Sequence, residues 1–136
     1  MKLEIVADAS GLPLGVAPAA ANVSEYDLAM PALDDVPVAI PAGTPVIADR
    51  GHDSDDLRDD IEDEGMRPVI PHRRNRVRPS RNDGRRLRRY RRRWIVERTN
   101  AWLHCYRGLA VRWARYSFMY VGLVYTAVID MALKRF

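Results

Sequence analysis

The charges of this sequence are divided between its two halves, and this division limits how the chain can fold. The 136 residues contain 22 Lys and Arg and 18 Asp and Glu, so the formal net charge is +4. Residues 1–66 hold 15 acids and 3 bases, a net charge of −12, whereas residues 67–136 hold 19 bases and 3 acids, a net charge of +16. An acidic half followed by a basic half predicts either long-range pairing between the halves or a nucleic-acid partner.

Composition excludes several classes of protein. With 47% apolar residues, the chain is not a disordered charged tail. Its single cysteine, Cys105, excludes a disulfide framework and a cysteine-based zinc cluster. The N-terminus lacks the pattern of a signal peptide. The apolar segment 118–129 is shorter than the roughly 20 residues that a membrane span needs. We therefore expect no membrane association and a cytoplasmic, nucleoid-associated protein.

The order of apolar and polar segments predicts a mixed α/β domain. Alternating residues around a turn at 8–11 predict a β-hairpin, and the runs at 44–48 and 67–70 predict two short strands. Helices are predicted from a cap at Ser24 or Asn22 to about residue 33, and from about 54 to 64. A polar loop covers 72–84, one long helix is expected over 85–107, and a final helix over 111–133. Its expected packing partners are Trp102, Leu109, Trp113 and Tyr116.

One face of the predicted long helix carries a distinctive set of polar residues. At 100° per residue, four side chains fall within about 60° of one another: Tyr90, Arg93, Glu97 and His104. Arg93 and Glu97 are spaced i, i+4 and could form an ordinary helical salt bridge. However, Glu97 is the only carboxylate between Asp83 and Asp130. An isolated acid among arginines also fits a metal ligand within a phosphate-binding surface.

A second carboxylate for such a metal would have to come from the acidic half, and Asp49 is the candidate. It follows the apolar run at 44–48, and α/β sheets commonly place functional groups at the carboxyl ends of strands. The alternative is that Asp49 is a turn residue that binds its own backbone ahead of Gly51.

Three motifs, in order, resemble bacterial insertion-sequence transposases of the DDE type. Tyr90-x2-Arg93-x3-Glu97-x6-His104 is similar to their Y-x2-R-x3-E-x6-K signature, with His104 where lysine is usual. Segment 46–54, which contains Asp49, resembles their second-aspartate motif, and segment 68–75 resembles the short strand and basic stretch that follow it. Histidine can donate to phosphate, but it is only partly charged near neutral pH.

The resemblance implies an RNase H-like fold and two-metal phosphoryl transfer on DNA. It would make Asp49 the second catalytic, metal-binding carboxylate and Glu97 the third, with Mg²⁺ or Mn²⁺ as cofactor. The residues expected to bind DNA are Tyr90, Arg93, His104, Arg73, Arg74, Arg89 and Arg92. Expected partners are double-stranded DNA, as terminal inverted repeats and target, and further copies of the chain in a synaptic complex.

The first carboxylate of this family lies on a strand that precedes the hairpin, and this sequence starts at the hairpin. Neither Glu4 nor Asp8 matches the first motif. We therefore expect residues 1–136 to form a single, partial catalytic domain, N-terminally truncated, without the first, central strand of its sheet. Its parts are 1–71 with the sheet and acidic helices, 72–84 as a basic loop, and 85–136 as a helical part. Such a chain is expected to be inactive alone. It could be a remnant of a decayed element, a second reading frame joined to an upstream reading-frame product, or a sequence with a wrongly assigned start.

A different class of function remains open. Region 67–98 contains 14 Arg in 32 residues, with two aromatic residues interleaved, and could be a non-catalytic DNA- or RNA-binding module. Part of it, residues 73–81, could also be only a solvated loop. A weaker alternative is an oligomerisation or membrane-associated role for the terminal apolar helix.

Overall fold

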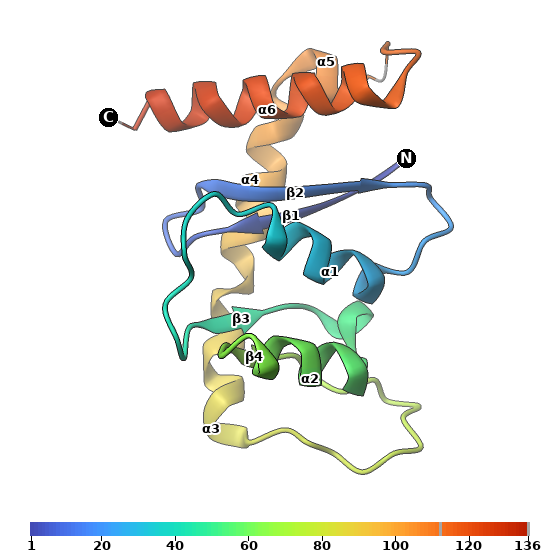
Figure 1. The fold of residues 1–136 in the computed structure, drawn as a ribbon, viewed down its shortest axis with the longest axis vertical. Coiled ribbons are helices and arrows are strands. Elements are labelled where there is room, and N and C mark those ends of the chain that lie inside the picture. Colours follow the sequence, from blue (N-terminus) through green and yellow to red (C-terminus); the bar gives the residue numbers. More distant parts are fainter. Residues whose placement is uncertain (112, 136) are drawn as a thin grey trace.

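The structure, a computed structural model, describes residues 1–111 and 113–135 and contains two small, separate sheets (Figure 1). In the first sheet, β1 (Lys2–Ala7) pairs antiparallel with β2 (Pro13–Ala19). In the second sheet, β3 (Pro45–Ile47) pairs parallel with β4 (Arg67–Val69). The predicted hairpin and the two short strands are therefore confirmed.

Two helices accompany the sheets and confirm the predicted helices of the acidic half. The first, α1 (Glu25–Asp34), has Ser24 as its N-cap residue. The second, α2 (Asp55–Asp63), follows a 3₁₀ turn, η1 (Arg50–His52), and is capped by Ser54, whose Oγ accepts the Leu57 N–H. The apolar faces of α1 and α2 share one core, which includes Ala29, Leu33, Leu57, Ile61, Met66 and Ile70.

The helical half is divided more finely than the sequence predicts. The expected helix over 85–107 consists of α3 (Gly84–Leu87), the 3₁₀ segment η2 (Arg88–Arg93) and α4 (Trp94–His104). Five of the six residues of η2 are arginine. Like charges spaced i, i+4 destabilise an α-helix, so this segment is poorly suited to continuous α-helical winding. The prediction of a single helix is therefore wrong.

A second core joins the terminal helix to the first sheet. After α5 (Arg107–Ala110), α6 (Ser117–Leu133) begins at Ser117 rather than at 111 as predicted, and Arg112 lies outside the described residues. This core contains Val16, Leu103, Leu109, Val124, Ala127 and Met131. Within the described part of the chain, no helix is both long and apolar enough to cross a membrane.

Three of the four predicted packing partners of the terminal helix are exposed instead. Leu109 is buried, but Trp102, Trp113 and Tyr116 are 37%, 77% and 55% exposed. Trp102 is covered by guanidinium groups rather than by apolar side chains: the Cζ atoms of Arg98 and Arg135 lie 4.6 Å and 5.3 Å from its ring centre. Cation–π contacts of this kind stabilise an aromatic ring at the surface.

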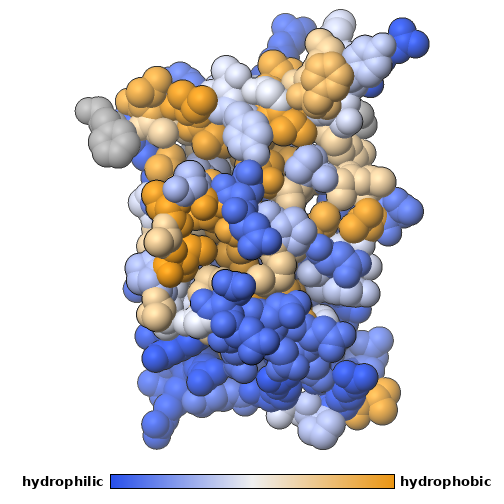
Figure 2. Space-filling model, viewed as in Figure 1, coloured by the Kyte–Doolittle hydropathy of each residue, from blue (hydrophilic) through white to orange (hydrophobic). Residues whose placement is uncertain are grey.

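Acidic and basic residues pair across the two halves of the chain. Figure 2 shows hydrophilic residues gathered over the end of the molecule that holds α2 and the loop 72–84. Asp53 accepts from Arg76 at 2.8 Å, and Asp59 accepts from Arg81 at 2.7 Å. The predicted long-range pairing is therefore confirmed, and much of the loop 72–84 is held against α2.

Candidate functional site

Asp49 lies directly after β3 and has one occupied and one available carboxylate oxygen. Its Oδ1 accepts the Gly51 N–H at 2.8 Å and lies 2.9 Å from His52 Nδ1. Within residues 1–111 and 113–135, Oδ2 has no hydrogen-bond partner, and the side chain is 43% exposed. Asp49 is thus the expected turn residue, and it also presents an oriented, accessible carboxylate oxygen.

His52 connects Asp49 to the first sheet. Its side chain is 8% exposed, and its Nε2 lies 3.1 Å from Glu4 Oε1. Burial alone would lower the pKa of His52, but the hydrogen bonds and charges of Glu4 and then of Asp49 outweigh it and raise that pKa above its usual value. A protonated His52 can donate to both carboxylates at once and hold Asp49 in one orientation.

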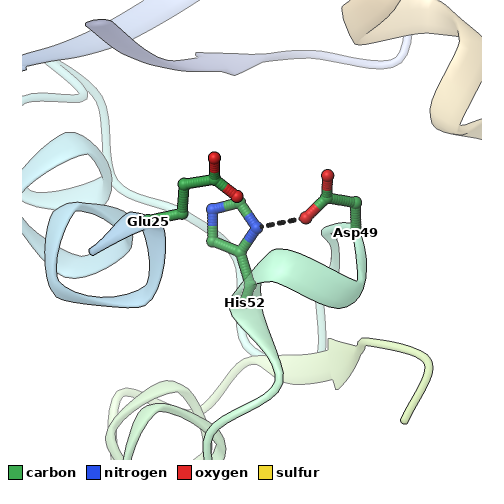
Figure 3. A group of neighbouring side chains, drawn as sticks. All are labelled: Glu25, Asp49 and His52. Atoms are coloured by element: carbon green, nitrogen blue, oxygen red, sulfur yellow. Dashed lines mark hydrogen bonds and ion pairs between the residues drawn. The ribbon is translucent and has the colours of Figure 1, made fainter. Parts of the chain in front are cut away.

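Glu25, at the start of α1, approaches the same turn (Figure 3). Glu25, Asp49 and His52 each present one potential ligand atom, and these atoms lie within 4.8 Å of one another. Glycine at position 51 permits this approach, because a Cβ there would lie 1.9 Å from Glu25 Oε2. Sequence reasoning missed Glu25 altogether, since a single acid in the first turn of a helix is an ordinary feature.

Arg93 pairs with Glu97 and lies on η2, which packs against β3. Its Nη2 donates to Glu97 Oε1 at 2.5 Å, and its Nη1 donates to Tyr90 Oη at 3.1 Å. Burial would raise the pKa of Asp49, but hydrogen bonds from His52 and Gly51, with the charges of His52 and Arg93, hold it below its usual value. Arg93 therefore binds Glu97 directly and acts electrostatically on Asp49.

The other predicted DNA-binding residues have different surroundings. His104 is exposed at the far end of α4, seven positions after Glu97, which corresponds to about 10 Å along the helix axis. Arg73 donates from its side chain to the carbonyl oxygens of Arg50 and Gly51, at 2.9 Å and 2.7 Å. Of the described residues, Arg74, Arg89 and Arg92 are exposed and form no ion pair with another described residue.

Comparison with known sequences identifies the family to which these motifs belong. The sequence model described as "Transposase DDE domain" matches residues 1–128. The chain belongs to the DDE transposase domain family. It is also 40% identical over 121 residues to a Burkholderia cepacia protein named as a transposase for insertion sequence element IS402, an alignment that covers 84% of this chain and 54% of that protein. The chain thus spans about half the length of this relative. No solved structure matches it.

Family membership agrees with the observed architecture. DDE transposase domains have an RNase H-like fold, and the chain has the mixed α/β composition that this fold requires. The Asp49 and Glu97 motifs both lie inside the matched segment.

Proposed function

We propose that this chain is part of an insertion-sequence transposase that cleaves and joins DNA with divalent metal ions. Asp49 and Glu97 are its metal ligands and catalytic carboxylates. The observation that carries this proposal is the packing of η2 against β3, which brings Arg93, the partner of Glu97, to the strand that Asp49 follows. Two motifs far apart in sequence thereby come to neighbouring elements.

The donor atoms near Asp49 suit a hard divalent cation. Mg²⁺ prefers carboxylate oxygens, and Mn²⁺ accepts oxygen and imidazole nitrogen. Asp49 Oδ2 is available, and Glu97 is 55% exposed. His52 and the Gly51 N–H occupy Oδ1, and partners of this kind typically orient a ligating carboxylate. When bound, such ions would activate the attacking oxygen and stabilise the leaving oxygen of phosphoryl transfer.

The arginines would hold the DNA backbone beside these ligands. Arg74, Arg89 and Arg92 present exposed guanidinium groups, which suit bidentate contacts to phosphate. Arg93 and Tyr90 would contact phosphate nearest to Glu97. His104, at the opposite end of α4, would donate a hydrogen bond to a more distant phosphate.

Metal binding tests the proposed ligands. In calorimetric titrations of the 136-residue chain with Mn²⁺, Asp49→Asn and Glu97→Gln should each weaken binding by about tenfold or more, as loss of a charged ligand does. Asp59→Asn removes an exposed carboxylate on α2 and should leave binding unchanged. Equal affinities in all four proteins would contradict the assignment.

We also propose that the 136-residue polypeptide alone does not cleave DNA. Only Asp49 and Glu97 match carboxylates of the DDE motif, and a DDE site uses three. Incubation with DNA that carries terminal inverted repeats, in Mg²⁺ or Mn²⁺, should give no nicked product. Nicking by the wild type that Glu97→Gln abolishes would overturn this expectation.

The second candidate function is a non-catalytic DNA- or RNA-binding module. The exposed, unpaired guanidinium groups of Arg74, Arg89 and Arg92 favour it as much as they favour a transposase. A simple binder should have the same DNA affinity with and without Mg²⁺ and after Asp49→Asn. A metal-dependent affinity that Asp49→Asn removes would exclude it.

We further propose that the chain self-associates through α6. Several large apolar side chains of this helix are at least half exposed: Phe118, Met119, Ile129 and Leu133. Large exposed apolar side chains gathered on one helix commonly mark a protein interface. Sedimentation should show a concentration-dependent oligomer that Ile129→Lys weakens, and a monomer at all concentrations would contradict this.

A further inference from the structure

Several arginines of the basic half lie against the acids of α2. We call three of them the arginine strip, two from the loop 72–84 and one from α3: Arg78, Arg81 and Arg86. Their partners follow one another along α2: Asp55, Asp59 and Glu62. The nitrogen–oxygen distances in these pairs are 3.5, 2.7 and 3.8 Å, in that order. Figure 1 shows the loop, α2 and α3 at the same end of the molecule.

The three acids form a row along one face of α2. At 100° and 1.5 Å per residue, positions 55, 59 and 62 fall within about 60° of one another and span about 10 Å of the helix axis. One strand of duplex DNA also presents a row of anions, with one phosphate per about 3.4 Å of its axis. Arginine binds carboxylate and phosphate with the same donors, often in the same bidentate geometry. The arginine strip is therefore arranged for a row of anions that DNA can also supply.

Exposure separates the arginine strip from the arginine that anchors the loop. Arg76 is only 12% exposed and pairs with Asp53, which is 2% exposed. The side chains of the arginine strip are between 36% and 74% exposed. Exposed ion pairs add little to stability, because water screens them and long side chains lose freedom in forming them. The strip can therefore exchange its partners while Arg76 keeps the loop in place.

We propose that the arginine strip is a further surface for the DNA backbone, which α2 occupies as an internal competitor when DNA is absent. The proposal rests on the proposed function, because it takes DNA as the partner. It goes beyond that function by assigning a role to α2 and to arginines that are already paired. In the sequence the strip lies between Arg74 and Arg89, whose side chains are exposed.

An internal competitor lowers the affinity for every DNA molecule. Each phosphate that binds the strip has to displace a carboxylate, so a brief contact with DNA gains little from these arginines. Discrimination against unwanted partners often depends on such a built-in cost. In the wild-type chain, we expect the strip to remain largely paired and to contribute few phosphate contacts.

The salt dependence of DNA binding by the 136-residue chain tests this proposal, because its slope counts phosphate contacts. Asp59→Asn combined with Glu62→Gln removes acids that lie 2.7 Å from Arg81 and 3.8 Å from Arg86. On duplex DNA, the slope of log K against log salt should steepen by about 0.9 for each released arginine. Fluorescence anisotropy with a labelled duplex of mixed sequence measures this slope.

The matched control is Asp60→Asn combined with Asp63→Asn. Both residues are exposed on the same helix, and neither forms an ion pair with another residue in the described ranges. The control removes the same charge as Asp59→Asn with Glu62→Gln but releases no arginine. Its slope should therefore equal that of the wild type.

A further substitution identifies the released arginine. In the chain with Asp59→Asn and Glu62→Gln, Arg81→Gln should reduce the slope by about 0.9. The same substitution in the wild-type chain should have a smaller effect, because Arg81 is paired there with Asp59. Effects of interacting residues are not additive, and this difference measures the competition.

The outcomes separate this inference from the proposed function. If the wild type binds DNA and the two double variants have equal slopes, the inference is overturned and the proposed function stands. A steeper slope that Arg81→Gln does not reduce would also overturn the inference. Binding by the chain with Asp59→Asn and Glu62→Gln, but not by the wild type or the control, would support it. Binding by none of the proteins would contradict both.

Discussion

Asp53 has a buried carboxylate surrounded by cations. Its side chain is 2% exposed and lies 3.1 Å from Arg58 and 2.8 Å from Arg76. It also accepts the Arg73 N–H at 2.8 Å and contacts His72. In the sequence, Asp53 is simply part of an Asp-Ser pair before α2, which is a common capping pattern, and its partners Arg73 and Arg76 lie about 20 positions away.

Removal of the Asp53 charge should strongly destabilise the protein. Asp53→Asn would leave the buried Arg58 without its counter-ion, and we expect a loss of about 3 kcal/mol in the free energy of unfolding in urea. Asp59→Asn breaks an exposed pair with Arg81 and should cost less than about 1 kcal/mol. Similar losses for the two variants would show that burial of the pair is unimportant.

The pH dependence of stability should reveal the same contribution of the Asp53 charge to the free energy of unfolding. Burial would raise the pKa of Asp53, but hydrogen bonds from Arg73 and His72 and the charges of Arg58 and Arg76 hold it below the usual 3.8. Stability from this group is therefore present above pH 3.8 and is lost as the pH falls through the folded-state pKa. Between pH 6 and pH 3, unfolding free energies should fall more steeply for the wild type than for Asp53→Asn. Parallel pH profiles would contradict this.

At the scale of elements, Arg76 fastens the loop 72–84 to α2. It donates to Asp53 at 2.8 Å and to Asp55 at 2.5 Å. Arg76→Gln should therefore release the loop and increase the initial rate of trypsin cleavage after Arg74 by about tenfold, because cleavage follows the population of open loop. Arg78 precedes Pro79, so trypsin does not cleave after it, and its side chain is 74% exposed with a longer, 3.5 Å contact to Asp55; Arg78→Gln should therefore change that rate much less.

Elements that depend on local pattern were the ones that the sequence predicted well. The hairpin, β3, β4, α1 and α2 each have their own turn, cap or apolar run within a few residues. The break in the predicted helix over 85–107 was missed because the 3₁₀ segment η2 contains neither proline nor glycine, the residues that usually indicate a break.

The candidate site was only partly predictable for a related reason. Asp49 and Glu97 were found from motif spacing. The packing of η2 against β3, and the approach of Glu25 to Asp49, depend on how separate elements pack, and periodicity carries no information about that. The prediction that Tyr90 and His104 share one face assumed a single uniform α-helix. Tyr90 instead lies in the 3₁₀ segment η2.

At the scale of the whole molecule, the net charge of the basic half overstates the number of arginines available to DNA. Several are already paired with acids of α2 and its N-terminal turn. We expect Arg74→Gln, Arg89→Gln and Arg92→Gln each to reduce the slope of log K against log salt by about 0.9 on duplex DNA. Arg81→Gln, at an arginine that is paired with Asp59, should change it less. Fluorescence anisotropy at several salt concentrations measures these slopes, and equal slopes in all variants would refute the assignment.

The turn of the first hairpin is held by residues from distant parts of the chain. The Ser10 carbonyl accepts from Arg98 at 2.8 Å and from Arg135 at 3.1 Å, across 88 and 125 positions of sequence. Contacts over such separations form late, because the intervening loop must close first. During synthesis, the hairpin can form early, but its turn gains its full set of partners only after residue 135 has left the ribosome. The strands of this hairpin can therefore pair early, whereas its turn is completed late.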